Sequence, residues 1–263
     1  MTTASDSDEL VHLDVADRVA TITLDSPANR NALSLQLVAD LHRALDGAEA
    51  GIADGSVRSI VLTHTAPAFC SGADLKARST GGSVDSRPMV RAFERLMDAE
   101  VPTIAAVTGP VRAGGIGLMA ACDLVVVHHD VTFALTEVRI GVAAAIISVP
   151  IFRRASASHL ASAFLTGEPF AATKAREAGL VTHVTDDVTT VVDMLTAGIA
   201  LGGPIAVAAT KRLLRGAFDR DADRRAADFE SVRQLSESLF VSEEAREGMA
   251  AFAEKRRPSW QGP

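Results

Sequence analysis

Two short segments of this sequence combine small residues with a helix start, an arrangement that leaves backbone amide groups open to a ligand. Ala113–Gly117 reads AGGIG, with three glycines in five positions, and Cys70–Asp74 reads CSGAD. Glycines at a helix start let a ligand approach the main chain, and the first N–H groups of a helix have no intrahelical partner. Two such N–H groups can together stabilise a developing oxyanion. We predict one backbone donor from each segment.

The first glycine segment also matches a dinucleotide-binding pattern. Gly115–Ala120 reads GIGLMA, and Glu137 follows Gly115 by twenty-two residues, where a ribose-binding acid can stand. That fingerprint needs its glycines directly after a strand, whereas Thr108–Gly114 separates them from the preceding one. Two strand-like segments also precede Glu137, where one is expected. A dinucleotide oxidoreductase stays an alternative that the spacing disfavours.

Two other chemistries have candidate residues without the arrangement that they need. Ser71 does not fit a nucleophile, because Phe69 stands where the G-x-S-x-G motif requires its first glycine. His128 and His129 are adjacent in a predicted strand, so their side chains are expected to point to opposite faces, and no ligand cluster surrounds them. The sequence therefore predicts no metal site.

Hydrophobic periodicity predicts the elements that must position these segments. Residues 11–15 and 19–24 alternate as a β-hairpin, and a helix with Asn31 or Ser34 as its N-cap follows. Further elements then alternate along the chain: apolar strands over 59–63, 103–107 and 124–127, and a helix over 88–99. Strands that alternate with helices, several of them fully apolar, indicate an α/β fold with a parallel sheet.

The last part of the chain has helical signals and no strand signals. Pro204 suits a first helical turn, and residues 229–239 place apolar side chains at helical spacing. Such stripes need a partner surface, either on the core or on another subunit. We therefore divide the chain into a core of residues 1–203 and a C-terminal helical region of residues 204–263.

Composition limits the classes of function. The chain has 263 residues and a net charge of −7, which gives no broad electrostatic footprint for nucleic acid or an anionic membrane. The start MTTASDSDEL lacks the features of a secretory signal, and no apolar run reaches the ~18 residues of a membrane span. Cys70 and Cys122 form no C-x-x-C pair and are expected to be small buried residues. The expectation is a cytoplasmic protein with a small-molecule ligand.

The glycine segments belong to a set of motifs that spans almost the whole chain. In order, these are Asn29–Leu33, Ala68–Lys76, Ala105–Asp123, Ala175–Val181 and Glu247–Arg256. Each is weak alone, but together they are specific, and the chain resembles the crotonase family of enoyl-CoA hydratases and isomerases. The resemblance implies a spiral of repeated ββα units. It also implies C-terminal helices that assemble a homotrimer or a dimer of trimers.

The resemblance further implies an acyl-CoA thioester as substrate, with no cofactor beyond its coenzyme A moiety. The thioester oxygen would lie between the N–H groups of Ala73 and Gly114, the same donors that the glycine segments indicate. Asp74, Leu75 and Lys76 fall where relatives line the CoA site. Asp74 as a helix-start residue and Lys76 as a solvated charge are the alternative.

Relatives that hydrate enoyl-CoA use two glutamates, and this chain keeps one. Phe133–Gly141 matches the motif of the second, which makes Glu137 the acid–base candidate, whereas Gly117 occupies the position of the first. Two carboxylates help to activate water, but one beside an enolate can move a proton between carbons. We predict isomerisation of a 3-enoyl-CoA to a 2-enoyl-CoA, with Glu137 as the proton shuttle. A structural acid at a strand end, either solvated or in a salt bridge for which Arg139 is a candidate partner, is the alternative.

The segment after Glu137 also departs from the family. Val142–Ser148 reads VAAAIIS where many members have a Pro-Gly-Gly loop, so it supplies no second acid and would make the acyl pocket more apolar. Two other functions stay open. One is an enoyl-CoA hydratase that relies on Glu137 alone or on a carboxylate from elsewhere, and the other is a non-catalytic acyl-CoA-binding protein.

Overall fold

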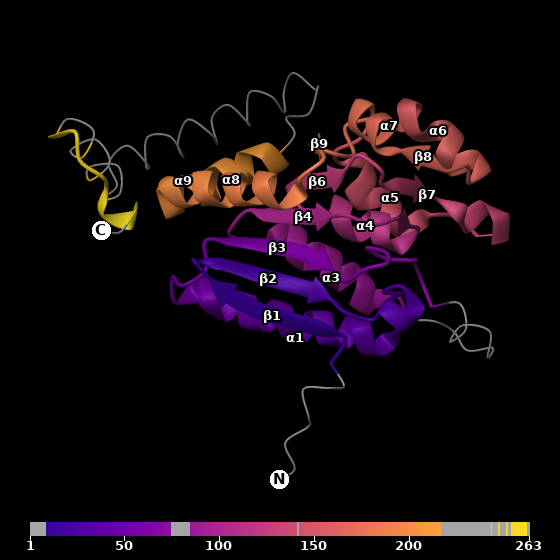
Figure 1. Cartoon of the computed structure of the whole chain (residues 1–263), viewed down its shortest axis with the longest axis horizontal. Helices are drawn as coiled ribbons and strands as arrows, with labels where there is room; N and C mark the ends of the chain where they lie inside the picture. The colour runs from indigo at the N-terminus through magenta and orange to yellow at the C-terminus, as the bar shows by residue number, and fades with distance from the viewer. Residues whose placement is uncertain are drawn as a thin grey trace, which may run out of the picture.

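A computed structural model describes residues 9–74, 85–140, 142–216, 243, 247, 251 and 254–261. In this part of the chain the largest unit is a six-stranded sheet with the order β1-β2-β3-β4-β6-β9 (Figure 1). Its strands are β1 (Val11–Ala16), β2 (Val19–Leu24), β3 (Ser59–His64), β4 (Thr103–Val107), β6 (Leu124–His128) and β9 (His183–Thr185). The first pair is antiparallel and the later pairs are parallel. The predicted hairpin and parallel sheet are confirmed.

The burial of the strands follows from the helices that cover them. β2 alternates half-buried and buried residues, whereas all five residues of β4 are buried, as in a parallel strand covered on both faces. Helices α1 (Leu35–Ala53) and α3 (Arg87–Asp98) contribute to the main core on one face. Helix α8 (Val188–Leu201) packs on the other face, where its partners are Val61, Ile104, Ala106 and Val126.

The start of α1 resolves the alternative left by the sequence. Ser34 is the N-cap, because its Oγ accepts a hydrogen bond of 3.1 Å from the N–H of Leu37. Asn31 has another role, in the turn before the helix. Leu37, Leu41 and Leu45 recur at every fourth residue of this helix, and all three are buried in the main core.

A smaller inner layer joins the segments that carry the site. It contains β5 (Val111–Arg112), β7 (Thr132–Ala134) and β8 (Phe170–Ala171), which form a sheet of three strands in the described residues. Isolated bridges extend this layer from Leu33 to Ala73 and from Cys70 to Val111. Successive turns of the chain therefore place one strand in the large sheet and the next segment in the inner layer. This is the predicted spiral of strand–strand–helix units.

The remaining helices follow the inner layer and the sheet. They are α4 (Gly114–Ala120), α5 (Ala145–Phe152), α6 (Ala157–Thr166), α7 (Ala172–Glu177) and α9 (Pro204–Arg215), with 3₁₀ turns η1 (Pro27–Asn29), η2 (Thr136–Ile140) and η3 (Ser259–Gln261). Pro204 begins α9 as predicted. No single helix in the described ranges is long and apolar enough to span a membrane, although α8 and most of α9 meet that test as a pair bent by 116°.

The C-terminal part of the chain returns to the core. Trp260 Nε1 donates a hydrogen bond of 3.2 Å to the carbonyl of Leu201, and Arg18 donates one of 2.8 Å to the carbonyl of Trp260. The apolar spacing over residues 229–239 lies outside the described residues. The division at residue 203 stays a prediction.

One sequence expectation about β6 is wrong. The strand ends at His128, so His129 lies outside it and is not held to the alternation of a strand. The two imidazole rings lie side by side, with their centroids 4.3 Å apart.

Candidate active site

The two predicted donor segments lie against each other in the inner layer. The N–H of Leu33 donates a hydrogen bond of 2.8 Å to the carbonyl of Gly72, and Leu33 also bridges to Ala73. Gly72 has a φ of +94°, and a Cβ placed on it would lie 2.9 Å from the Cβ of Ala113. Only glycine fits that conformation and that contact. Gly72 therefore packs against Ala113, which brings the following residues, Ala73 and Gly114, to the same part of the inner layer.

The N–H groups of Ala73 and Gly114 are the open donors of this arrangement. Both residues are half-buried, and neither N–H donates a hydrogen bond to another group in the described ranges. Ala113 has a φ of +46°, an uncommon conformation for a residue with a side chain, and its own N–H donates to the carbonyl of Ala134 at 3.0 Å. Strain of this kind is typical of functional turns. The geometry fits the predicted oxyanion site.

Glu137 lies in η2, which begins two residues after the end of β7. The last residue of β7, Ala134, accepts the hydrogen bond of the Ala113 N–H. Its side chain is half-buried, and its Oε2 is buried without a hydrogen-bond partner in the described structure. Burial disfavours the charged form and raises the pKa of the Glu137 carboxyl. A carboxyl with one unpartnered oxygen and a raised pKa is better suited than a fully solvated one to take up and return a proton.

The alternative of a structural ion pair with Arg139 is wrong. The Arg139 guanidinium pairs with Glu168, with 2.6 Å between Nη2 and Oε1, and its Nε donates to the carbonyl of Thr166. A Cβ on Gly167 would lie 2.9 Å from that Nε, so this glycine leaves room for the arginine. Arg139 is held by α6 and the residues after it, and Glu137 is left without that partner.

The predicted CoA-binding residues are described only in part. Asp74 follows the donor Ala73 and is half-buried, whereas Leu75 and Lys76 lie outside the described residues. Ser71 donates to the carbonyl of Asn29 at 3.1 Å, a structural contact that agrees with its rejection as a nucleophile. Cys70 and Cys122 are buried as expected, and burial raises the pKa of both thiols to about 12.

Comparison with known proteins decides the family. A family model described as enoyl-CoA hydratase/isomerase matches residues 14–263. The chain belongs to this family. A 2,3-dehydroadipyl-CoA hydratase from Escherichia coli is 34% identical over 252 residues, which cover 93% of this chain and 96% of that protein.

Solved structures agree with this assignment. An enoyl-CoA hydratase from Mycobacterium avium is 43% identical with a TM-score of 0.72, over 96% of this chain and 99% of that one. An enoyl-CoA hydratase from Bacillus anthracis is 27% identical with a TM-score of 0.86, over 97% and 100%. The chain has the crotonase fold and is an enzyme of the hydratase/isomerase type.

Apolar side chains fill the space beside Gly117, the residue that by motif position replaces the first glutamate of hydratases. A Cβ on Gly117 would lie 2.6 Å from Cγ2 and 2.8 Å from Cβ of Ile147, and 2.9 Å from Cζ of Phe93. Gly117, Ile147 and Phe93 are all buried. The missing side chain thus lets α5 pack directly on α4. The two departures from the family pattern therefore meet, because Ile147 of the segment 142–148 packs on Gly117. Gly117, Ile147 and Phe93 are called the packing unit below.

Asn31 is a site residue whose role sequence reasoning missed. It is fully buried, and its Oδ1 accepts a hydrogen bond of 2.6 Å from the N–H of Ser26. Its Nδ2 donates to the carbonyls of Ala68 at 2.9 Å and Thr65 at 3.2 Å. Asn31 therefore fixes the segment that leads to Ala73. The family motif Asn29–Leu33 contains this residue, but its place before the helix suggested only an N-cap.

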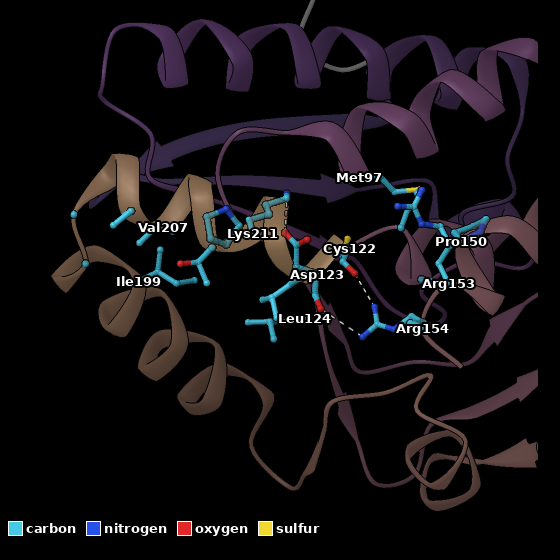
Figure 2. A pocket seen from close by; sticks show the side chains of 18 residues that line it. Met97, Cys122, Asp123, Leu124, Pro150, Arg153, Arg154, Ile199, Val207 and Lys211 are labelled. Carbon is cyan, nitrogen blue, oxygen red and sulfur yellow. Dashed lines mark hydrogen bonds and ion pairs between the residues drawn. The ribbon is translucent and has the colours of Figure 1, made fainter. Parts of the chain in front are cut away.

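A cavity of about 440 Å³ lies beyond this packing unit. It is lined by Met97, Ala121 and Pro150, each about one helical turn past Phe93, Gly117 and Ile147. Figure 2 shows its charged groups, of which Lys211 pairs with Asp123 at 2.7 Å and Arg154 donates to the carbonyl of Cys122 at 2.6 Å. None of the predicted site residues that the structure describes lines this cavity, so it is separate from the candidate site.

Proposed function

We propose that this enzyme isomerises a 3-enoyl-CoA to a 2-enoyl-CoA. The packing of Ile147 against Gly117 carries the proposal, because hydrocarbon fills the space that a second carboxylate would need. Adding water needs a polar site that holds and deprotonates the water, whereas moving a double bond needs one proton carrier beside an enolate. Glu137 supplies that carrier.

The proposed reaction starts with the thioester oxygen between the N–H groups of Ala73 and Gly114. The Glu137 carboxylate takes a proton from C2, and the electron pair of the C2–H bond moves into the C1–C2 bond as the oxygen becomes an enolate. The two N–H groups stabilise this negative charge. The enolate oxygen then re-forms the carbonyl, the C1–C2 π pair moves into the C2–C3 bond, and the C3–C4 π pair takes the proton from Glu137 at C4. The double bond lies between C2 and C3 at the end, and Glu137 is again a carboxylate.

Hydration of an enoyl-CoA is the second candidate, because the relatives compared above are named as hydratases. The two reactions separate on a small panel of 2-enoyl-CoA and 3-enoyl-CoA thioesters, with products resolved by chromatography. We expect 3-enoyl-CoA to give 2-enoyl-CoA without a hydroxyacyl product. Formation of 3-hydroxyacyl-CoA from the 2-enoyl-CoA, at rates typical of enzymes and without isomerisation, would instead establish the hydratase.

We also propose that the chain works as a homotrimer or a dimer of trimers. Several large apolar side chains of α8 and α9 are exposed in the single chain, among them Leu201 at 60%, Ile205 at 51% and Leu214 at 80%. Exposed apolar groups of this kind favour a covering partner. Light scattering measures the mass, and a monomer at the working concentration of the enzyme contradicts this proposal.

A further inference from the structure

A cluster of imidazole and carboxylate groups stands at the end of β6, apart from Glu137 and the open amides. His128 is the last residue of the strand, His129 and Asp130 lie in the turn after it, and Asp186 comes from the loop after β9. The N–H of His129 donates to the carbonyl of Thr185 at 3.0 Å, which holds the turn against β9. Within the described ranges, His128, His129 and Asp130 alone form a group of three such residues with ligand atoms all within 4.8 Å of one another.

The contacts of His129 indicate which of its two ring nitrogens carries the proton and which has the lone pair. Its Nδ1 lies 2.6 Å from Oδ1 of Asp186, and its Nε2 lies 3.0 Å from Oδ1 of Asp130. A neutral imidazole has one N–H and can donate to one carboxylate only. The shorter contact places that proton on Nδ1, toward Asp186. The lone pair of Nε2 then faces the Asp130 carboxylate.

His128 adds a second lone pair on the same side. Its Nδ1 lies 3.3 Å from the backbone N–H of Asp130, which donates to it, and 3.7 Å from Oδ2 of Asp130. The lone pair of His128 Nδ1 accepts this long hydrogen bond, which a bound metal ion would displace. One ligand atom from each of His128, His129 and Asp130 lies within 4.8 Å of the other two, close enough for one ion to bind all three.

We propose that His128 Nδ1, His129 Nε2 and the Asp130 carboxylate bind a divalent transition-metal ion of the Zn²⁺ type. Two imidazoles and a carboxylate are ligands that Zn²⁺ accepts, with bonds of about 2.0–2.2 Å, so tetrahedral ligand atoms stand about 3.3–3.6 Å apart. His129 Nε2 lies 3.0 Å from Oδ1 of Asp130 and His128 Nδ1 lies 3.7 Å from Oδ2, so each imidazole is near one of the two carboxylate oxygens at about that spacing. The fourth position is open to water.

Asp186 has a supporting role in this site. Ligand histidines usually donate their other ring N–H to a carboxylate, which fixes the tautomer and the orientation of the ring. The contact between His129 Nδ1 and Asp186 supplies that bond. Because Asp186 precedes α8 and the ligands follow β6, the bound ion would join two loops that are separate in the sequence.

The test is calorimetric titration of Zn²⁺ into the full chain after treatment with a chelator, in a buffer that does not bind metal. We expect one Zn²⁺ per chain and a higher melting temperature in its presence. His129→Gln and Asp130→Asn should lose stoichiometric binding. Asp186→Asn should weaken it by about 10–100-fold, because the ring is no longer held. His159→Gln, at an exposed histidine of α6, is the matched control and should bind as the wild type does.

Two results would overturn the proposal. One is a wild-type chain that binds no stoichiometric Zn²⁺, in which case the contacts of His129 with the two carboxylates only hold the two loops together. The other is undiminished binding by the folded Asp130→Asn and Asp186→Asn variants, which replace a carboxylate by an amide of the same shape. Circular dichroism establishes that each variant is folded before it is titrated.

Discussion

Gly114 and Gly117 lie one turn apart on α4 and lack a side chain for opposite reasons. At Gly114 the backbone N–H is open, and an added Cβ would meet only Cδ1 of Leu33, at 2.6 Å. At Gly117 the space is closed, because Ile147 and Phe93 lie within 3 Å of the same position. The first glycine exposes the main chain to a ligand, and the second admits a neighbouring helix. A glycine-rich motif therefore has to be interpreted one residue at a time.

The chemistry proposed for the open end of this comparison, at Gly114, depends on Glu137. Glu137→Gln keeps the shape of the side chain but cannot accept the proton, so we expect isomerisation to fall by about 10²–10⁴-fold with little change in KM. Steady-state rates on a 3-enoyl-CoA measure this. Glu168→Gln, which changes an exposed partner of Arg139, is the control and should keep activity. Normal turnover by Glu137→Gln would remove Glu137 from the mechanism.

The packing at Gly117, the closed end of the comparison, is tested by introducing a glutamate at this position. Gly117→Glu should lower the free energy of unfolding by about 3 kcal/mol, because the side chain collides with Ile147 and carries a charge into a buried place. Ile147→Gly should cost less stability in the Gly117→Glu background than in the wild type, because it removes the collision, and it should admit water addition to a 2-enoyl-CoA. Denaturant unfolding measures the coupling in a double-mutant cycle.

The control for the closed end is Gly198→Glu. Gly198 lies in α8 with nothing within 4 Å of an added Cβ, so this substitution should change the free energy of unfolding of the protein very little. If Gly117→Glu is as stable as the wild type, or if the two changes at 117 and 147 are strictly additive, the packing unit does not exist as described.

The two glycines can also be compared by the same small change. Gly117→Ala should cost about 1–2 kcal/mol of unfolding free energy, because its methyl group meets Cβ of Ile147, which cannot turn away. Gly114→Ala should cost less than about 1 kcal/mol, since the end of Leu33 can move, but should lower kcat/KM by about tenfold because the methyl group stands beside the donor N–H. Equal effects of both changes on stability and on rate would remove the distinction.

Sequence patterns predicted the elements well where burial alone decides them. The strands 19–24 and 103–107 have the predicted bounds, because alternation and full apolarity report directly how each face is covered. The small residues around Ala73 and Gly114 indicated open backbone N–H groups, and motif position assigned these two residues; their role as donors to a ligand stays a prediction. Family motifs located Glu137.

The features that the sequence did not predict depend on contacts between residues that are distant in the sequence. Ile147 fills the space over Gly117 only because α5 packs on α4, and no periodicity reports which residue of α5 arrives there. Asn31 was a possible N-cap in sequence, yet its amide holds Ala68. His129 was assigned to a strand that ends one residue earlier, and this error hid the carboxylates around it.

The smallest expected effect is the pH dependence that burial gives to the open end. Because the native pKa of Glu137 is raised, its carboxyl binds a proton more tightly when folded than when unfolded. Stability is therefore lost as pH rises from the ordinary pKa of a glutamate through the raised one, and Glu137→Gln escapes that loss. Over about pH 4 to 8, we expect Glu137→Gln to gain stability relative to the wild type as pH rises. Over the same range kcat/KM of the wild type should rise, since only the carboxylate accepts the C2 proton. Urea unfolding and rate profiles give the two curves, and a stability difference that does not change with pH would mean that the folded structure leaves the carboxyl as solvated as the unfolded chain does.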